Sequence, residues 1–269
     1  MNKAFGDNDW AVILGASSGF GEATSLELSK WGLNICGIHL DRRGTLPHVQ
    51  EVINGVQANG KKALFFNINA ADEEKRREAI AAMKQEVSGT AGFIRVLLHS
   101  LAFGTLKPMI ANSDEEQINP TQMNMTLDVM AHSLIYWAQD LNRNGLLQQG
   151  SRIFAMTSLG SQLATKSYGA VSAAKSALES HIRQLTLELA PQGITVNAIR
   201  AGVTYTPSLQ KIPGHENLME AALKKNPSGR LTTPVDVART IAVLSHPDTY
   251  WMTGNTINVD GGEMIVGTK

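Results

Sequence analysis

Short apolar runs alternate with longer amphipathic stretches along almost the whole sequence, and this alternation limits the fold more than any other feature. The apolar runs cover residues 10–15, 34–40, 63–68, 93–99, 152–156, 194–199 and 256–259. Because they are hydrophobic at nearly every position, they are typical of strands covered on both faces, as in parallel sheets. Helical patterns lie between them, at residues 21–32, 73–87 and 173–193. The sequence therefore predicts an α/β fold with a doubly wound parallel sheet of about seven strands.

The chain of 269 residues contains no internal repeat, low-complexity tract or Pro/Gly-rich linker. Residues 1–269 are therefore predicted to form a single domain. The longest break in the strand–helix pattern runs over residues 204–229, after the sixth predicted strand. Ligands bind outside the carboxyl ends of the strands in such sheets, so this long connection is a candidate substrate lid.

Charge and cysteine content narrow the class of protein. Lys and Arg total 24, and Asp and Glu also total 24, so nothing indicates nucleic acid or an anionic membrane as a partner. Cys36 is the only cysteine, so no internal disulfide can form, which fits a reducing compartment. No signal-peptide pattern opens the chain and no apolar window is long enough to span a membrane. We expect a soluble cytoplasmic protein.

A glycine-rich turn, GASSGFG, directly follows the first predicted strand and opens a helix. Glycines let the backbone turn tightly and approach a pyrophosphate, and the helix start supplies free N–H groups. The spacing G-x-x-x-G-x-G differs from the usual dinucleotide-binding pattern, and a strand–helix turn that merely contains glycines is the alternative. Its place after the first strand favours cofactor binding. The cofactor-binding candidates here are Gly15, Ser17, Ser18, Gly19, Phe20 and Gly21.

The end of the second predicted strand bears on the choice of cofactor. NAD sites place an acid there to hold the ribose, whereas an arginine suits the 2′-phosphate of NADP. His39 occupies the usual acid position, and Arg42 and Arg43 follow shortly after. Guanidinium groups match a dianionic phosphate, so NADPH is favoured over NADH, although a solvated charge cluster is the alternative. Asn69 and Ala70, past the third strand, are further cofactor-binding candidates. Asn69 could hydrogen-bond adenine, and a simple turn role is the alternative for it.

Tyr168 and Lys175 lie seven positions apart near the start of an Ala-rich helical stretch. Positions i and i+7 share nearly one helix face, because about 3.6 residues make a turn, so the phenol and the ammonium point the same way. A surface tyrosine with an unrelated helix-face lysine is the alternative.

With GASSGFG, Ser158, Tyr168, Lys175 and the sequence NVDGG at residues 258–262, the whole chain resembles the short-chain dehydrogenase/reductase superfamily. The stretch ITVNAIRAG resembles the superfamily's sixth strand, with Ala201 in place of proline. The resemblance implies a Rossmann-like sheet of seven strands, a bound NAD(P) and hydride transfer to or from carbon.

Three departures from the common superfamily pattern resemble the enoyl-acyl-carrier-protein reductase branch. The chain has Tyr-x6-Lys instead of Tyr-x3-Lys, HSLAF at residues 99–103, and Met130 where an Asn commonly stands. The sequence around Tyr168 most resembles the NADPH-using type. In that branch the displaced tyrosine meets a thioester oxygen that lies further from the hydride-accepting carbon than a ketone oxygen would.

The resemblance implies roles for individual residues. Tyr168 would donate a hydrogen bond to the developing enolate, and Lys175 would hold the nicotinamide ribose and lower the pKa of Tyr168. Ser158 matches the superfamily's catalytic serine, although a tyrosine stands there in many enoyl reductases, and substrate binding or strand capping are alternatives. Phe103 would line the acyl slot, and His99 is expected to pack at a strand end. Further cofactor contacts are expected at Ser100, Leu101, Ala102, Gly202, Thr204 and Thr206.

Three hypotheses of function follow. The first is an NADPH-dependent reductase of enoyl thioesters, carried on coenzyme A or acyl carrier protein. The second is a carbonyl reductase or alcohol dehydrogenase of the same fold, and the third is an NAD(P) sensor without chemistry. The resemblance also implies a homotetramer, and no cluster with metal-ligand spacing occurs in the sequence.

Overall fold

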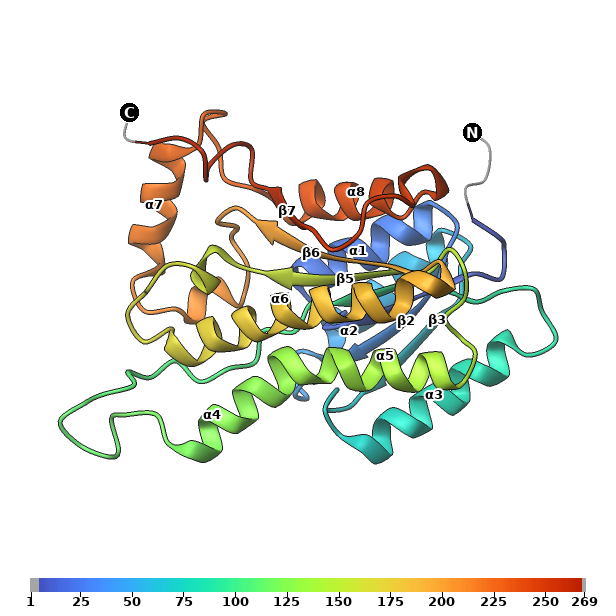
Figure 1. The fold of residues 1–269 in the computed structure, drawn as a ribbon, viewed down its shortest axis with the longest axis horizontal. Coiled ribbons are helices and arrows are strands. Elements are labelled where there is room, and N and C mark those ends of the chain that lie inside the picture. Colours follow the sequence, from blue (N-terminus) through green and yellow to red (C-terminus); the bar gives the residue numbers. More distant parts are fainter. Residues whose placement is uncertain (1–4, 268–269) are drawn as a thin grey trace.

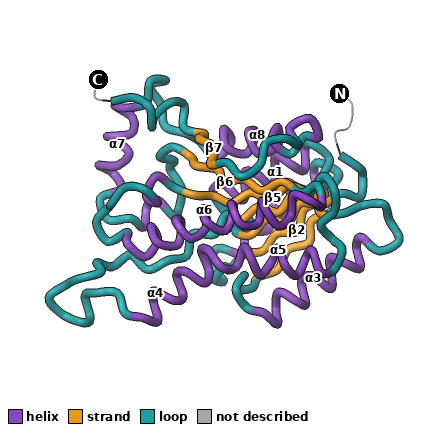
Figure 2. Tube along the Cα trace, in the orientation of Figure 1, coloured by secondary structure: helices purple, strands orange, loops and turns teal. Residues whose placement is uncertain are grey.

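The computed structural model describes residues 5–267, and at its centre is one parallel sheet of seven strands (Figures 1 and 2). The strand order is β3-β2-β1-β4-β5-β6-β7, so the chain winds outward from β1 in one direction and then from β4 in the other. This confirms the predicted doubly wound, Rossmann-like sheet. The strands are β1 (Trp10–Leu14), β2 (Asn34–His39), β3 (Ala63–Asn67), β4 (Ile94–His99), β5 (Arg152–Thr157), β6 (Thr195–Ala201) and β7 (Thr256–Val259).

Helices cover both faces of the sheet (Figure 1). One face packs against α1 (Gly19–Lys30), α2 (Leu46–Ala58) and α8 (Pro234–Leu244). The other packs against α3 (Glu73–Val87), α5 (Ser133–Arg143) and α6 (Gly169–Leu189). The strands are apolar at successive positions because both of their faces are buried, and in β1 Val12 and Ile13 belong to opposite cores.

A π-helical turn, η1 (Asp128–His132), joins α4 (Pro120–Leu127) to α5 and makes the three almost continuous (Figure 1). The helix α7 (His215–Lys225) lies inside the segment 204–229. Short 3₁₀ turns occur at η2 (Leu159–Ser161), η3 (Ala190–Gln192), η4 (Leu209–Lys211) and η5 (Pro247–Thr249).

The longest stretch without helix or strand between residues 5 and 267 is 100–119, which follows β4. The sequence placed the longest break at 204–229, but α7 and η4 occupy part of that segment. Residues 204–229 as a substrate lid remain a prediction.

Cys36 lies on β2 with no exposed surface, and burial raises the pKa of its thiol. Within residues 5–267, no helix combines the length and the apolar character that crossing a membrane requires.

Candidate active site

The predicted site residues gather at one edge of the sheet, where all the parallel strands end at their carboxyl termini. The glycine-rich turn follows β1, Arg42 and Arg43 follow β2, and Asn69 and Ala70 follow β3. The other predicted residues stand after β4, β5 and β6 or at the start of α6: Ser100, Leu101, Ala102, Phe103, Ser158, Tyr168, Lys175, Gly202, Thr204 and Thr206.

The turn after β1 and the first turn of α1 are packed so closely that only glycine fits at positions 15 and 21. A Cβ on Gly15 would stand 2.5 Å from the Ser100 carbonyl oxygen, and φ there is +90°. A Cβ on Gly21 would stand 2.0 Å from the Gly15 carbonyl oxygen. The turn therefore presents bare backbone at the edge of the sheet, which is what close approach of a pyrophosphate requires.

The start of α1 leaves hydrogen-bond donors available. Ser18 is the N-cap but its side chain makes no capping hydrogen bond, so its hydroxyl is free for an anion. Gly19 faces Thr206, whose Cγ2 would lie 3.4 Å from an added Cβ. The Thr206 hydroxyl oxygen accepts from the Leu209 N–H at 3.2 Å, which leaves its hydrogen for another acceptor. These groups fit the phosphates of a dinucleotide.

At the adenosine end, the Asp41 carboxylate is already occupied by groups of the chain. It accepts a hydrogen bond from Thr45 at 2.7 Å and lies 3.0 Å from His39 Nδ1. Burial opposes ionisation, but hydrogen bonds from Ser17, Thr45 and His39 hold the pKa of Asp41 below its usual value. The sequence analysis did not assign Asp41, which joins the end of β2 to the glycine-rich turn.

Arg42 and Arg43 are exposed, and their guanidinium groups make no hydrogen bond or ion pair with residues 5–267, although the Arg42 carbonyl accepts from Thr45 Oγ1 at 3.0 Å. Asn69 is also exposed, and its Oδ1 accepts from the Ala71 N–H at 3.0 Å, as in a turn; its contact with adenine stays a prediction. The Ala70 carbonyl accepts from Trp137 Nε1 at 2.9 Å, so this residue anchors α5 to the turn after β3.

Tyr168 is the N-cap of α6 and lies half-buried against η2. Its ring packs on Gly160, where an added Cβ would stand 2.5 Å from the ring Cε1. Ser167, directly before it, has φ +60°, which is uncommon for a residue other than glycine. Burial raises the pKa of Tyr168, and a hydrogen bond with Ser158 acts in the opposite direction.

The expected effect of Lys175 on Tyr168 is not seen. The family resemblance implied that the Lys175 charge lowers the pKa of Tyr168, but burial is the dominant cause and raises it, and Lys175 does not contribute to the shift. The phenol therefore stays protonated at neutral pH, as a hydrogen-bond donor must.

Lys175 is almost fully buried on α6 and joins three elements. Its Nζ donates to the Met156 carbonyl at 2.7 Å and lies 3.4 Å from the Leu101 carbonyl, so it ties α6 to the ends of β5 and β4. Burial lowers the pKa of Lys175 to about 8, against the effect of the Glu179 charge. Burial and the two carbonyl oxygens near Nζ hold the Lys175 ammonium in a fixed place.

His99 is fully buried at the end of β4, where its Nε2 lies 2.9 Å from Ser133 Oγ. Burial and the Lys175 charge lower the pKa of His99 to about 3, so the ring is neutral. This matches the expected packing role.

Large apolar side chains stand exposed on the loops that follow β4, β5 and β6: Phe103, Met109, Leu163 and Tyr205. Met109 packs beside the start of α6, because a Cβ on Gly169 would meet its Cε at 2.6 Å. No sequence pattern marks Met109, since its place depends on the path of the long loop after β4.

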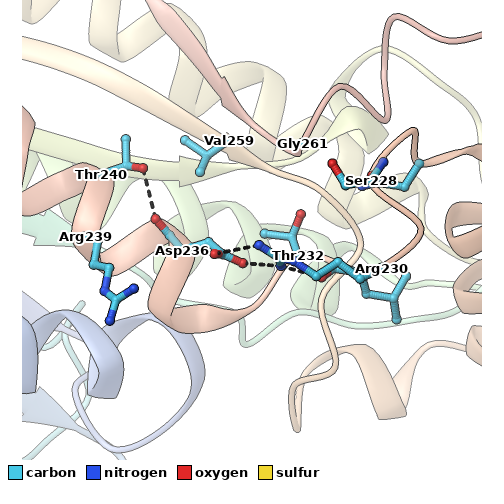
Figure 3. Close-up of a pocket in the computed structure, with 10 residues that line it drawn as sticks. Ser228, Arg230, Thr232, Asp236, Arg239, Thr240, Val259 and Gly261 are labelled. Atoms are coloured by element: carbon cyan, nitrogen blue, oxygen red, sulfur yellow. Dashed lines mark hydrogen bonds and ion pairs between the residues drawn. The ribbon is translucent and has the colours of Figure 1, made fainter.

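Figure 3 shows a cavity beside the start of α8, lined among others by Ser228, Thr232 and Arg239. The Arg230–Asp236 ion pair borders it, with Nη1 2.7 Å from Oδ2. None of the predicted catalytic or cofactor-binding residues lines this cavity. No group of three or more His, Cys, Asp or Glu that could hold a metal occurs in the part of the chain that the structure describes.

Residues 15–263 match the protein family described as Enoyl-(Acyl carrier protein) reductase. The chain belongs to this family. It is an NAD(P)-dependent oxidoreductase of the short-chain dehydrogenase/reductase superfamily, as the glycine-rich turn and the pair Tyr168 and Lys175 indicated.

Relatives within the family catalyse different reductions. The chain is 28% identical over 258 residues to 1-cyclohexenylcarbonyl-CoA reductase of Streptomyces collinus, covering 95% of this chain and 87% of that protein. It is 29% identical over 206 residues to the NADPH-dependent enoyl-acyl-carrier-protein reductase FabI of Staphylococcus aureus, covering 77% of each. Tetrahydroxynaphthalene reductase of Pyricularia oryzae is 25% identical over 267 residues, covering 94% of this chain and 88% of that protein.

Solved structures agree in fold. A dehydrogenase/reductase from Sinorhizobium meliloti superposes with a TM-score of 0.80 at 23% identity, covering 95% of this chain and 94% of that one. The NADH-dependent enoyl-acyl-carrier-protein reductase of Aquifex aeolicus superposes with a TM-score of 0.79 at 24% identity, covering 97% and 98%.

Proposed function

We propose that this protein is an NADPH-dependent reductase of enoyl thioesters. The observation that carries the proposal is the placement of Tyr168 at the N-cap of α6, seven residues before the buried Lys175. A nicotinamide bound at this edge of the sheet would supply a hydride to the β-carbon, and negative charge would then develop on the thioester oxygen. A phenol set back along the helix suits an oxygen that lies far from the reacting carbon.

The role of Tyr168 is to stabilise that oxygen. Because burial raises its pKa, the phenol keeps its proton at neutral pH and donates a hydrogen bond to the enolate. The proton that completes the saturated product would reach the α-carbon from water, in a transfer separate from the hydride step. Lys175, held by the Met156 carbonyl, would bind the ribose next to the nicotinamide.

The cofactor preference rests on charge at the end of β2. Both arginines, Arg42 and Arg43, are exposed and unpaired with residues 5–267, so they are available to a 2′-phosphate. The Asp41 carboxylate is held by donors of the chain and has less capacity for a ribose hydroxyl. NADPH is therefore the proposed cofactor, with NADH weaker.

The neighbourhood of Ser158 favours a second candidate function, the reduction of a carbonyl. Ser158 hydrogen-bonds Tyr168, and a serine–tyrosine pair of this kind can polarise a ketone oxygen. The two candidate functions differ in the bond that is reduced, C=C or C=O, so one panel of substrates distinguishes them.

The panel follows loss of NADPH absorbance with crotonyl and acetoacetyl thioesters, each carried on coenzyme A or on acyl carrier protein. The proposed function predicts turnover of the crotonyl compounds and none of the acetoacetyl ones. The reverse result supports the carbonyl reductase, and cofactor binding without any turnover supports a sensor. Repeating the panel with NADH tests the cofactor preference. The preferred carrier identifies the partner, and a homotetramer is the oligomer that we expect to purify.

A further inference from the structure

We propose that Glu179 is a positioning residue. One of its two carboxylate oxygens, Oε1, fixes the relative positions of the segments that carry Ser158, Tyr168, Lys175 and Gly202. The inference rests on the proposed site and assigns a task to a residue that does not itself touch the substrate.

The geometry around Glu179 is unusual because three donors converge on one atom. Its Oε1 accepts from Thr157 Oγ1 at 2.7 Å and from Arg200 Nη2 at 3.1 Å. It also lies 2.8 Å from Ser161 Oγ, whose one hydroxyl hydrogen has the Ser158 carbonyl oxygen, at 2.9 Å, as a second acceptor within reach. The side chains of the Arg200–Glu179 ion pair are 9% and 13% exposed. Water therefore contributes little to holding these groups, and the hydrogen bonds among them set their relative positions.

Each of these three residues lies next to a segment that carries a candidate site residue. Thr157 precedes Ser158 at the end of β5, and Ser161 ends the turn η2 on which the Tyr168 ring packs. Arg200 lies near the end of β6, shortly before Gly202. Glu179 itself follows Lys175 by one turn of α6, so one carboxylate connects the ends of two strands, β5 and β6, and the turn η2 to the helix that carries Lys175.

The charge of Glu179 matters as well as its shape. Burial opposes ionisation, but hydrogen bonds from Thr157, Ser161 and Arg200 lower the pKa of Glu179, so it is an anion at neutral pH. That anion raises the pKa of Lys175 against the effect of burial. The Lys175 charge, together with burial, in turn lowers the pKa of the nearby His99 on β4, so the His99 ring is neutral.

The Arg200 guanidinium depends on the same carboxylate. Its Nε is buried without a hydrogen-bond partner among residues 5–267, and Glu179 is its ion-pair partner. Removal of Glu179 alone would leave a buried, uncompensated cation beside β5.

The first test is Glu179→Gln, which keeps the size and one acceptor oxygen but removes the charge. The neutral amide oxygen holds Arg200 and the two hydroxyls less strongly than a carboxylate does. We expect kcat to fall about tenfold or more, because small displacements of catalytic groups have large effects on rate. The affinity for NADPH, measured by fluorescence titration, should change by less than about threefold. The alkaline limb of the pH–rate profile should move to lower pH, since Lys175 loses the anion that supports its charge.

Asp140→Asn is the matched control. Arg76 and Asp140 form a comparably buried ion pair, at 2.7 Å with side chains 7% and 13% exposed, between α3 and α5 and outside the candidate site. This variant should lose stability to a similar degree while keeping kcat and the pH profile of the parent.

A double variant, Glu179→Leu with Arg200→Leu, covers the case in which Glu179→Gln does not fold. Replacing both charged side chains by leucine leaves no unpaired charge in the interior. The two leucines cannot accept hydrogen bonds from Thr157 and Ser161. We expect a folded protein with the same loss of kcat. Full kcat in either folded Glu179 variant, or an equal loss in the Asp140→Asn control, overturns the proposal.

The Glu179 test is separate from the test of the proposed function. Each variant is compared with the parent on whichever thioester the parent reduces, so a carbonyl reductase would still reveal the positioning role. Absence of any turnover by the parent overturns both.

Discussion

At the scale of single residues, burial sets the protonation of the two central side chains in opposite ways. It raises the pKa of Tyr168, which keeps the phenol neutral, and lowers the pKa of Lys175 to about 8, which brings its ammonium near deprotonation. The tyrosine therefore remains able to donate a hydrogen bond over a wide pH range, and under the proposed function the lysine would limit activity on the alkaline side.

Tyr168→Phe tests the donor role. Removal of one donor to a developing oxyanion lowers kcat by about 10²–10³-fold, and we expect a loss of that size with NADPH affinity unchanged. Steady-state kinetics on the preferred thioester and a binding titration measure the two quantities. Tyr250→Phe is the control, since Tyr250 is exposed and lies outside the site. A Tyr168→Phe enzyme with the parent rate would show that the phenol takes no part.

The Lys175 ammonium gives a pH prediction. A lowered pKa means that the folded protein releases this proton at about 8 rather than at the usual 10.5. If the cation holds the cofactor, kcat/KM for NADPH is constant below about pH 8 and falls about tenfold per pH unit above it. A profile that stays flat to pH 10 would contradict this role.

Deprotonation of Lys175, which is expected to lower activity as pH rises, has the opposite effect on the free energy of unfolding. Between pH 8 and 10.5 the unfolded chain binds the Lys175 proton and the folded protein does not, so this group makes the free energy of unfolding rise with pH there. Stability and activity therefore diverge on the alkaline side.

At the scale of elements, the turn η2 packs against the Tyr168 ring through Gly160. Gly160→Ala would place a methyl group 2.5 Å from the ring Cε1 and 3.3 Å from Ser158 Oγ. We expect kcat to fall about tenfold as the ring is displaced, with a loss of about 1–3 kcal/mol in the free energy of unfolding. Kinetics and urea denaturation measure the two effects.

Gly267→Ala is the control for that substitution, because an added Cβ there has no atom within 4 Å. It should match the parent in both assays. If Gly160→Ala does the same, the ring does not depend on η2 for its position.

The sequence predicted the elements better than their contacts. The helix predicted at residues 73–87 is α3, and the run at 63–68 is β3 to within a residue, because buried strands and amphipathic helices have strong local patterns. The path of residues 100–119 and the packing of Met109 depend on tertiary contacts without any local pattern. Glu179 was missed for the same reason, since its three donors come from separate segments.

At the scale of the whole molecule, the doubly wound sheet brings loops from distant parts of the chain to one edge. A dinucleotide there would contact the turns after β1, β2 and β6 together, so it binds the folded protein and not the unfolded chain. At 100 times its Kd, such a ligand adds about 2.7 kcal/mol to the free energy of unfolding. For a chain of this size we expect saturating NADPH to raise Tm by about 5–10 °C in a thermal-shift assay.

The same assay reports the cofactor preference. NADH at equal concentration should give a smaller shift, and Arg42→Ala with Arg43→Ala should reduce the NADPH shift to the level of NADH. Equal shifts for the two cofactors in the parent would contradict the role of these arginines.

The burial of Cys36 in β2 gives the protein an internal reporter of strand separation. A maleimide reagent cannot reach a thiol without exposed surface, and the raised pKa leaves almost no thiolate to react. Alkylation therefore proceeds only while β2 is detached from β1 and β3, at a rate proportional to how often that opening occurs. Because the chain has a single cysteine, mass spectrometry of the intact protein can time these openings without any engineered label.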